Sequence, residues 1–423
     1  MFDPLSFAAV ALLWFAGGAS GDASVWSPAV AVGGCVGVGV VSFVLGRVRR
    51  LRGRFNAMGP VALLGVFVVA VVEFGWPSWV VGVLPEWLWG VHEAAMLLPL
   101  AVGLALMEGS RAGGLGVGRA LRYGFERFRQ RSALVLLVFA VISGWSRAVD
   151  ALVWRRLGGG EAAEAWAAAG HALGAIGVIA LMPIALSALW RTRGVPAGEL
   201  RDRLLAVCQD SGVRVLMVRL WRPPAMVINA AMVGVLPATR AILLSEDLVR
   251  NLAPAEVEAV MAHEAGHARL WHLLWLVTVT AGWFGAGWAF VSAGFTVLGI
   301  DGELAGWLAM GVGGLIGIDA FGRASRVFER EADAFSARVM AGRLGGDAAG
   351  ASAMASALSR VAWLAGVSTG RFGFRHGSID ARIEALREIA LAGSAGGIGR
   401  AGVSVRAWGA GSLVVALLGV MLL

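Results

Sequence analysis

The residues with the clearest chemical potential form the segment H-E-A-G-H at residues 263–267. On an α-helix the two histidines, four residues apart, leave the same face, so both imidazoles can bind one metal ion. Glu264 lies between them, next to that ion but too close in sequence to share it comfortably. A zinc hydrolase needs two neutral nitrogen ligands, an open position for water and a carboxylate that takes the proton of that water. Pro254, followed by a stretch without helix breakers, predicts the helix that this chemistry requires.

A third ligand is needed, because so short a motif also occurs by chance on ordinary exposed helices. The candidate is Glu329, which shares a predicted helix face with Asp333, four residues further along. Glu329 can complete a His-His-Glu set, and Asp333 can accept the second N–H of a ligating imidazole and so fix its tautomer. The alternative interpretation of residues 325–335 is a solvated helix that carries charge pairs.

Two neighbouring ionisable residues are interpreted as bystanders. Glu331 points away from the face shared by Glu329 and Asp333, and we expect it to be solvated. His272 follows His267 by five residues and therefore points elsewhere on a continuous helix. We interpret it as an interfacial residue and not as a fourth ligand.

Four separated motifs carry a family resemblance. They are, in chain order, Asn229–Gly234 with the strand-like Ala241–Ser245, the histidine-bearing helix, Ser325–Asp333, and His376–Ser378 with Arg382–Ile383. Over about 190 residues, from Asp202 to Leu391, the chain resembles the integral-membrane zinc metallopeptidases that include the CAAX prenyl protease and the heat-shock protease HtpX. The third motif is similar to the family's S-R-x-x-E-x-x-A-D, and the fourth to H-P-x-x-x-x-R-I. The chain departs at Gly377, where the family has proline, which loosens the turn that aims His376.

The resemblance implies a zincin-like (gluzincin) catalytic domain with a small β element and one zinc ion per chain. It also implies that His376 donates to the developing oxyanion, with Arg382 in support. Asn229 is similar to a family residue that fixes the substrate backbone as an added strand beside the site. The zinc ligands carried over are His263, His267 and Glu329, with Glu264 as general base.

Composition independently indicates a membrane protein. Apolar residues make up 58% of the 423 residues and charged residues only 15%, outside the usual balance of a soluble domain. The net charge of +8 comes from arginines that cluster at the ends of apolar runs and do not gather on one aromatic-studded face. This distribution is typical of the positive-inside bias and argues against nucleic acid as a partner. The two cysteines offer neither a disulfide framework nor a metal cluster.

The apolar runs predict nine membrane spans, so the expected fold class is mainly α, a polytopic membrane bundle. The runs are residues 5–19, 26–46, 59–75, 87–107, 132–154, 166–190, 273–298, 304–321 and 407–423. The first could be a signal peptide, but Asp3 stands where a basic region should be, which favours a retained span. We expect five segments: a membrane region over 1–190, the first peptidase part over 191–272, a membrane hairpin over 273–321, the second peptidase part over 322–392, and a linker with the last span over 393–423.

The arginines also predict an orientation. Five arginines lie between Arg47 and Arg54, and six lie between Arg111 and Arg131. All the arginine-rich ends fall on one side if the N-terminus is cytoplasmic and all nine spans are real. The metal helix, the Glu329 helix and the His376 segment then face the cytoplasm from a cell (inner) membrane.

The expected function is hydrolysis of peptide bonds in membrane-associated or misfolded proteins by metal-activated water, with the lipid bilayer as surroundings. Glu264 accepts the proton of the water and passes it to the leaving nitrogen. Among substrates, damaged membrane proteins and lipid-modified C-termini both fit the motifs. A sensor-transducer metallopeptidase and a catalytically inactive scaffold remain alternatives, although the outside loops are too short for a receptor domain and the candidate ligands are intact.

Overall fold

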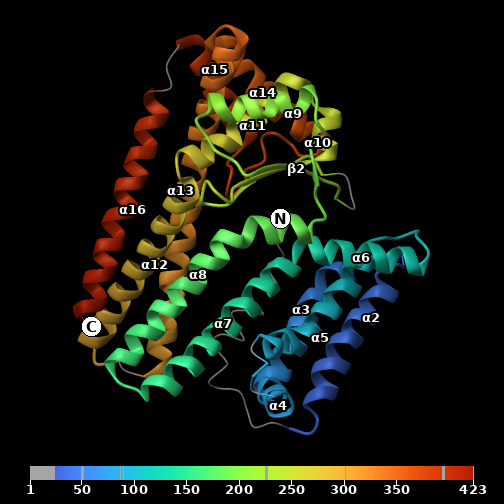
Figure 1. Ribbon diagram of the computed structural model, residues 1–423, viewed down its shortest axis with the longest axis vertical. Coiled ribbons are helices and arrows are strands. Elements are labelled where there is room, and N and C mark those ends of the chain that lie inside the picture. Colours follow the sequence, from blue (N-terminus) through green and yellow to red (C-terminus); the bar gives the residue numbers. More distant parts are fainter. Residues whose placement is uncertain are drawn as a thin grey trace. The chain divides into compact units, whose positions relative to one another are not determined.

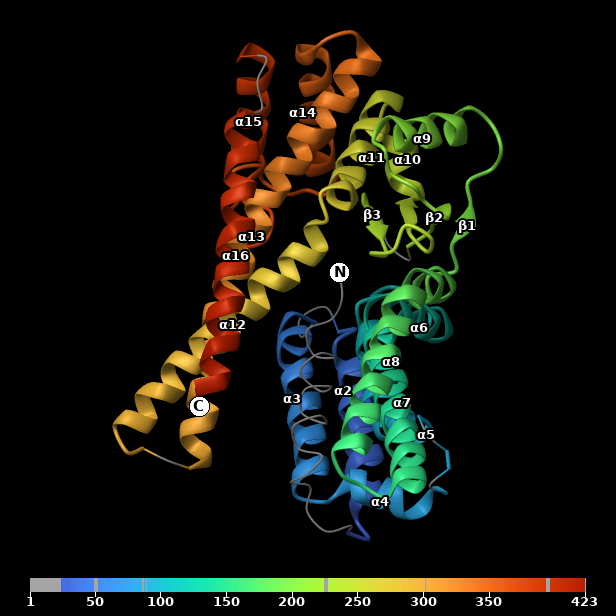
Figure 2. The same ribbon diagram turned by 60° about the vertical axis from the view of Figure 1, so that its left-hand side comes forward.

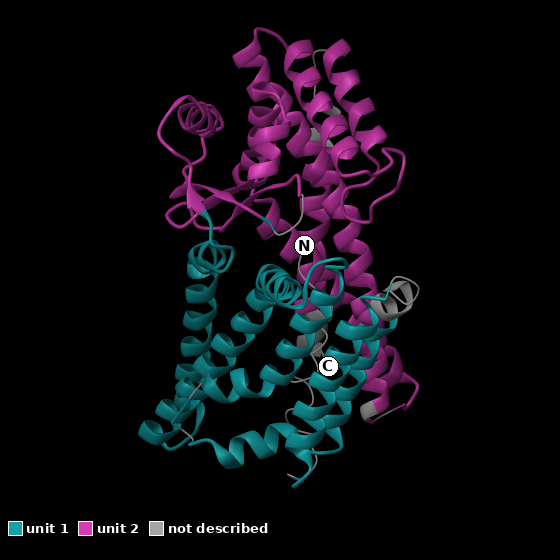
Figure 3. Cartoon of the chain, turned by 90° about the vertical axis from the view of Figure 1, so that its right-hand side faces the viewer, with its two compact units in different colours: residues 1–192, 223–225 teal, residues 193–222, 226–423 magenta. Residues whose placement is uncertain are grey.

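The computed structural model describes residues 24–48, 52–85, 87–88, 90–223, 227–300, 302–392 and 396–422. The predicted span at residues 5–19, including the choice between a span and a signal peptide, lies outside these residues. The chain divides into two compact units, residues 1–192 with 223–225, and residues 193–222 with 226–423 (Figure 3). The five segments expected from the sequence stay predictions.

The first unit is built from helices alone within its described part (Figure 1). In chain order they are η1 (Ala29–Gly34), α2 (Cys35–Leu45), α3 (Arg52–Val72), α4 (Trp76–Val83), α5 (Val91–Ser110), α6 (Val117–Arg131), α7 (Ala133–Leu157) and α8 (Glu161–Leu189). Apolar side chains of α2, α3, α5 and α7 form its core, among them Leu63, Phe67 and Leu100. The carboxylate of Glu108, at the end of α5, binds three arginines and ties α6 to that helix.

The second unit carries the sheet and the remaining helices. Its elements are β1 (Arg193–Gly194), α9 (Glu199–Asp210), β2 (Met217–Trp221), β3 (Ala230–Val233), β4 (Ala241–Ser245), α10 (Glu246–Asn251), α11 (Pro254–Arg269), α12 (His272–Val297), α13 (Glu303–Leu344), α14 (Asp347–Leu364), α15 (Ile379–Ala392) and α16 (Gly396–Leu422). The strand order is β1-β2-β4-β3, in which β2 and β4 are parallel and the other pairs are antiparallel.

Strand β4 is the centre of the sheet, and all five of its residues are buried. Its apolar run without alternation is typical of a strand covered on both faces. Ile242 pairs with Val218 of β2 on one side and with Met232 of β3 on the other. Side chains of β4 pack with Val257 and Met261 of α11, so the sheet supports the helix that carries the histidines.

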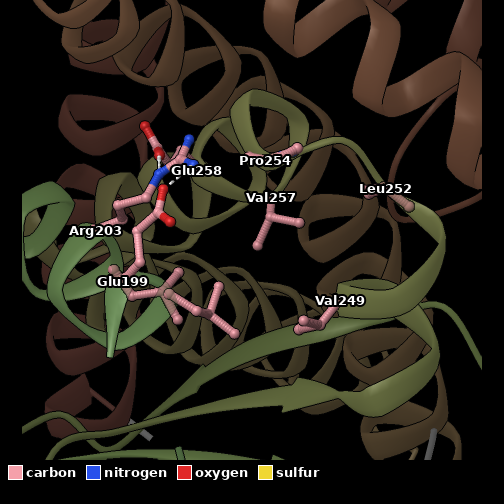
Figure 4. Close-up of a pocket in the computed structure, with 9 residues that line it drawn as sticks. Glu199, Arg203, Val249, Leu252, Pro254, Val257 and Glu258 are labelled. Carbon is pink, nitrogen blue, oxygen red and sulfur yellow. Dashed lines mark hydrogen bonds and ion pairs between the residues drawn. The ribbon is translucent and has the colours of Figure 1, made fainter. Parts of the chain in front are cut away.

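Helix α11 is also fixed at its start and on its far side. Pro254 occupies the first helical position, and the carboxylate of Glu256 accepts the N–H of Ala253 at 2.8 Å. The buried carboxylate of Glu258 binds Arg203 of α9 and Arg343 of α13, beside a cavity of about 200 Å³ (Figure 4). These contacts hold α11 in place from both neighbours.

Helices α12, α13 and α16 pack along one another and form the long helical arm of the second unit (Figures 1 and 2). Helix α13 continues from the apolar hairpin into the charged segment of Glu329 without a break. A glycine allows the close approach of α12 and α16, because a Cβ atom at Gly409 would lie 2.3 Å from Val279.

Within the described residues, five helices are long and apolar enough to span a membrane: α5, α7, α8, α12 and α13. A sixth candidate is the pair Met58–Val72 and Trp76–Val83, bent by 61°. The predicted span at 59–75 falls on this bent pair, which is either a broken span or a re-entrant loop, and Gly75 adopts a left-handed φ of 59° at the bend. Ala29–Leu45 and Ala401–Leu417 are shorter apolar helices. The predicted fold class, a helical polytopic membrane protein with a small β element, is confirmed.

Candidate metal centre

Three side chains from two helices converge on one point in the second unit. The Nε2 atoms of His263 and His267 on α11 lie 3.2 Å apart. Two oxygens of Glu329 on α13 lie 3.6 Å from Nε2 of His263 and 3.7 Å from Nε2 of His267. Among the described residues, these three form the group that could hold a metal ion. Their candidate ligand atoms all lie within 4.8 Å of one another. The sequence-predicted set of two histidines and a glutamate is therefore brought together.

The spacing of these atoms suits a tetrahedral zinc site. Zinc bonds to nitrogen and oxygen of about 2.0–2.2 Å place neighbouring ligand atoms about 3.3–3.6 Å apart, the edge of a tetrahedron. The two nitrogens lie 3.2 Å apart, and each lies 3.6 or 3.7 Å from a different oxygen of Glu329, close to these edge lengths. Burial, and next the nearby charge of His263, lower the pKa of His267 well below its usual value. The imidazole of His267 is thus neutral near pH 7, as a metal ligand must be.

Small residues let the two helices approach closely enough for their ligands to meet. A Cβ atom at Gly266 would lie 3.1 Å from the ring of Phe335 on α13. The hydroxyl of Ser336 donates to the carbonyl of Ala259 at 2.7 Å, which fixes the register of the pair. Since Ala334 and Ala337 are also buried there, α13 presents Glu329 to α11 across a seam of short side chains.

Asp333 lies one helical turn beyond Glu329 and contacts the outer nitrogen of His263. Its Oδ1 atom is 2.9 Å from Nδ1 of that histidine. Arg382 of α15 holds the same carboxylate through two hydrogen bonds of 2.6 and 2.7 Å. The carboxylate of Asp333 is the acceptor within reach of Nδ1, although the two groups are not aligned as a hydrogen bond. With its proton on Nδ1, His263 would keep the Nε2 lone pair for a metal.

The carboxylate of Glu329 is held by two further side chains. Nδ1 of His376 lies 2.9 Å from one oxygen, and Nη1 of Arg382 lies 3.1 Å from the other. Burial lowers the pKa of Arg382, but the charges of Asp333 and then Glu329 outweigh it and raise the pKa above its usual value. The contacts of Arg382 are therefore with the carboxylates, and its predicted support of His376 stays a prediction.

Glu264 is half-buried and is held by the sheet. The backbone N–H of Met232, in β3, donates to its carboxylate at 3.1 Å. Burial raises the pKa of Glu264 above its usual value, which is the direction that a general base near neutral pH requires. Residue type carries no signal for this contact, because a backbone group makes it.

Asn229 lies one residue before β3 with an exposed side chain. Its backbone N–H donates to the hydroxyl of Ser245, and its carbonyl accepts the N–H of Ser245 at 2.9 Å. These contacts fix the start of β3, and the predicted contact of Asn229 with substrate stays a prediction.

The loop around His376 explains the departure from the family pattern. Gly373 and Gly377 exchange backbone hydrogen bonds of 2.9 and 2.8 Å, and Gly377 adopts a φ of 71°. Proline has no N–H to donate and is locked near a φ of −65°, so this loop excludes it. Arg326 of α13 holds the same loop by donating to the carbonyl of Phe374 at 2.9 Å. Gly377 thus belongs to a tight turn and does not loosen it.

Two interpretations of bystander residues were wrong. Glu331 is 5% exposed and binds His272 and Arg406, so it is not a solvated charge. His272 is 3% exposed, and its Nδ1 atom lies 2.9 Å from Nδ1 of His267. The helix is not continuous, because α11 ends at Arg269 and His272 begins α12.

Comparison with known proteins bears on the segment that holds this centre. Residues 198–390 match Peptidase family M48. No match was found among curated proteins. A crystal structure of Ste24p from S. mikatae is similar at 15% sequence identity, with 91% of this chain and 99% of that chain covered and a TM-score of 0.45.

The matched segment contains all eight of the site residues predicted from the sequence, from Asn229 to Arg382. The resemblance drawn from the four motifs is therefore confirmed, and the apolar helices make the chain a multi-pass membrane protein. The match of residues 198–390 to Peptidase family M48, together with the apolar helices, supports a membrane metallopeptidase.

Proposed function

We propose that the chain is a zinc-dependent endopeptidase that cleaves membrane-associated or misfolded proteins. The observation that carries the proposal is the convergence of His263, His267 and Glu329 beside a fourth group, the carboxylate of Glu264. When bound, one zinc ion would polarise a carbonyl oxygen and lower the pKa of its water towards about 7. The other chemistry falls to the side chains around it.

Glu264 is the proposed general base. Its raised pKa lets it accept a proton from the attacking water and return that proton to the leaving nitrogen of the cleaved peptide. The hydrogen bond from Met232 N–H fixes one carboxylate oxygen and leaves the other for the water. Proton transfer by a positioned side chain typically contributes about 10²–10⁴-fold to a rate.

The substrate backbone has a place to bind beside this base. Strand β3 ends the four-stranded order within the described chain, and its outward N–H at Met232 already faces Glu264. An extended peptide can add to such an edge as a further strand. Asn229 would guide that peptide at the start of β3. His376, half exposed and 2.9 Å from Glu329, would donate to the oxyanion as it forms.

The position of the site supports substrates that are themselves in or on the membrane. The candidate membrane span α12 begins at His272, five residues after His267. Glu329 lies on α13, which is also a candidate membrane span. The arginine distribution places the site on the cytoplasmic side of the cell membrane only if all nine predicted spans are real, so this orientation stays a prediction.

The test is cleavage of a fluorescently labelled unfolded protein by the full chain purified in detergent. We expect wild type to cleave and Glu264→Gln to lose about 10²–10⁴-fold in rate while keeping its metal. Glu384→Gln, at an exposed carboxylate of α15, is the matched control and should cleave like wild type. A metal-loaded Glu264→Gln that cleaves normally would remove Glu264 as base. A wild type that binds zinc but never cleaves would favour the scaffold alternative.

A further inference from the structure

A line of buried polar contacts leads from the metal centre to the C-terminal membrane helix. Nδ1 of His267 lies 2.9 Å from Nδ1 of His272, and Nε2 of His272 lies 3.1 Å from a carboxylate oxygen of Glu331. Both oxygens of Glu331 bind the guanidinium of Arg406 on α16, at 2.8 and 3.2 Å. The mechanism proposed above uses none of the last three residues.

A distorted backbone makes the first contact possible. On a continuous helix, a residue five positions after His267 would point away from it. Here α11 ends, and Trp271 adopts a left-handed φ of 58° before α12 begins at His272. This conformation is rare for a bulky side chain and persists only where the surroundings enforce it. The break turns the ring of His272 back onto His267.

The order of donors and acceptors along this line is determined by its far end. An ionised carboxylate only accepts, so Glu331 takes the N–H at Nε2 of His272. The Nδ1 atom of neutral His272 is then an acceptor, and the N–H at Nδ1 of His267 donates to it. This leaves a lone pair on Nε2 of His267, the atom that faces His263 and Glu329. The arrangement therefore selects the tautomer of His267 that can bind a metal.

Packing holds the line rigidly. The ring of His272 stacks on Phe328 with centroids 4.5 Å apart and planes 6° apart. The guanidinium of Arg406 lies 5.4 Å from the centroid of the Phe328 ring. Helix α16 comes so close to Glu331 that a Cβ atom at Gly402 would lie 1.8 Å from its oxygen. The carboxylate thus has a fixed position between α13 and α16.

We propose that His272 and Glu331 are positioning residues for the metal ligand His267, and that Arg406 makes α16 part of the metal centre. This inference rests on the proposed function, because it assumes that His267 binds zinc. Partners that fix a ligating histidine typically change metal affinity by about 10–100-fold. Removal of the side-chain contacts of His272 or of Arg406 should therefore weaken zinc binding without removing a ligand.

The test measures zinc affinity of the full chain in detergent by competition with a chromophoric chelator. We expect His272→Phe and Arg406→Met to bind zinc about 10–100-fold more weakly than wild type. His272→Gln should recover much of the loss, because its amide can accept from His267 and donate to Glu331. Arg406→Lys should likewise recover part of the loss by keeping the charge. Arg323→Met, at an exposed ion pair of α13, is the matched control and should bind like wild type.

The outcomes separate this inference from the function beneath it. Wild-type affinity in His272→Phe would overturn the inference and leave the zinc peptidase intact. A wild type that binds no zinc would overturn both. Equal losses in His272→Phe and His272→Gln would show that an accepting and a donating atom at position 272 do not restore zinc binding, and would also overturn the inference. Circular dichroism of each variant, matching wild type, ensures that folded proteins are compared.

Discussion

Asp333 and Glu329 lie one turn apart on α13, and each lies beside a different ring nitrogen of His263. Oδ1 of Asp333 is 2.9 Å from Nδ1 of His263, and Oε2 of Glu329 is 3.6 Å from its Nε2. One helix face therefore supplies both a candidate ligand and the group that orients another ligand. The arrangement gives His263 the same kind of outer partner that His272 gives His267.

Asp333→Asn tests the partner of His263. The variant loses the charge that lies beside Nδ1 of His263 and that pairs with Arg382, so we expect zinc affinity to fall by about 10–100-fold. Chelator competition in detergent measures it. Asp319→Asn, which removes an exposed carboxylate of the same helix, should leave affinity unchanged. Equal affinities of Asp333→Asn and wild type would show that the contact has no bearing on the metal.

Gly377→Pro tests the loop that aims His376. Proline cannot adopt the φ of 71° and has no N–H for the hydrogen bond from Gly377 to Gly373. The loop should therefore change, and His376 should move away from Glu329. We expect peptidase activity to fall on the order of 10²-fold, the effect of a misplacement of about 1 Å, while zinc content stays the same. Gly377→Ala keeps the N–H and should lose less. Full activity in the proline variant would show that the family's proline is compatible with this site.

Glu246 makes stability depend on pH through contacts outside the metal centre. Burial raises the pKa of Glu246. Hydrogen bonding to Arg222 and the charges of Arg193, Arg222 and Arg250 lower it by more, so the net pKa lies below its usual value. A carboxyl whose folded pKa is depressed stabilises the fold above its unfolded pKa of about 4.3, and this stabilisation is lost as pH falls through the folded pKa. The sensitive window therefore lies below about pH 4.5.

The thermal midpoint of wild type and of Glu246→Gln, measured from pH 7 to pH 3, checks this assignment. The variant should melt lower at pH 7 and lose less on acidification than wild type does. Glu384→Gln, at an exposed carboxylate, should follow the wild-type curve. Parallel curves for wild type and Glu246→Gln would contradict the role of Glu246.

The candidate metal ligands were predictable because their geometry is local. A spacing of four residues on a helix places His263 with His267, and Glu329 with Asp333, on common faces whatever surrounds them. Length and hydropathy predicted the five span-length helices of the described chain, whereas the runs at 26–46 and 407–423 correspond to shorter apolar helices. The bend after α3 has a signal in Gly75 followed by Pro77.

The contacts between elements could not be predicted in the same way. Trp271 is not a residue type that signals a left-handed break, so the approach of His272 to His267 had no counterpart in the sequence. The pairing of Glu331 with Arg406 depends on how α16 packs on α13, across 75 residues of chain. The donation from Met232 to Glu264 comes from a backbone group, which every residue type except proline offers.

The central claim is that His263, His267 and Glu329 together hold one zinc ion. Elemental analysis of the detergent-purified full chain and of Glu329→Ala, both prepared without chelator, tests it most directly. We expect about one zinc per wild-type chain and its loss in the variant, because two histidines alone leave the site without its third protein ligand. Zinc retained equally in Glu329→Ala, or absent from wild type, would contradict the claim.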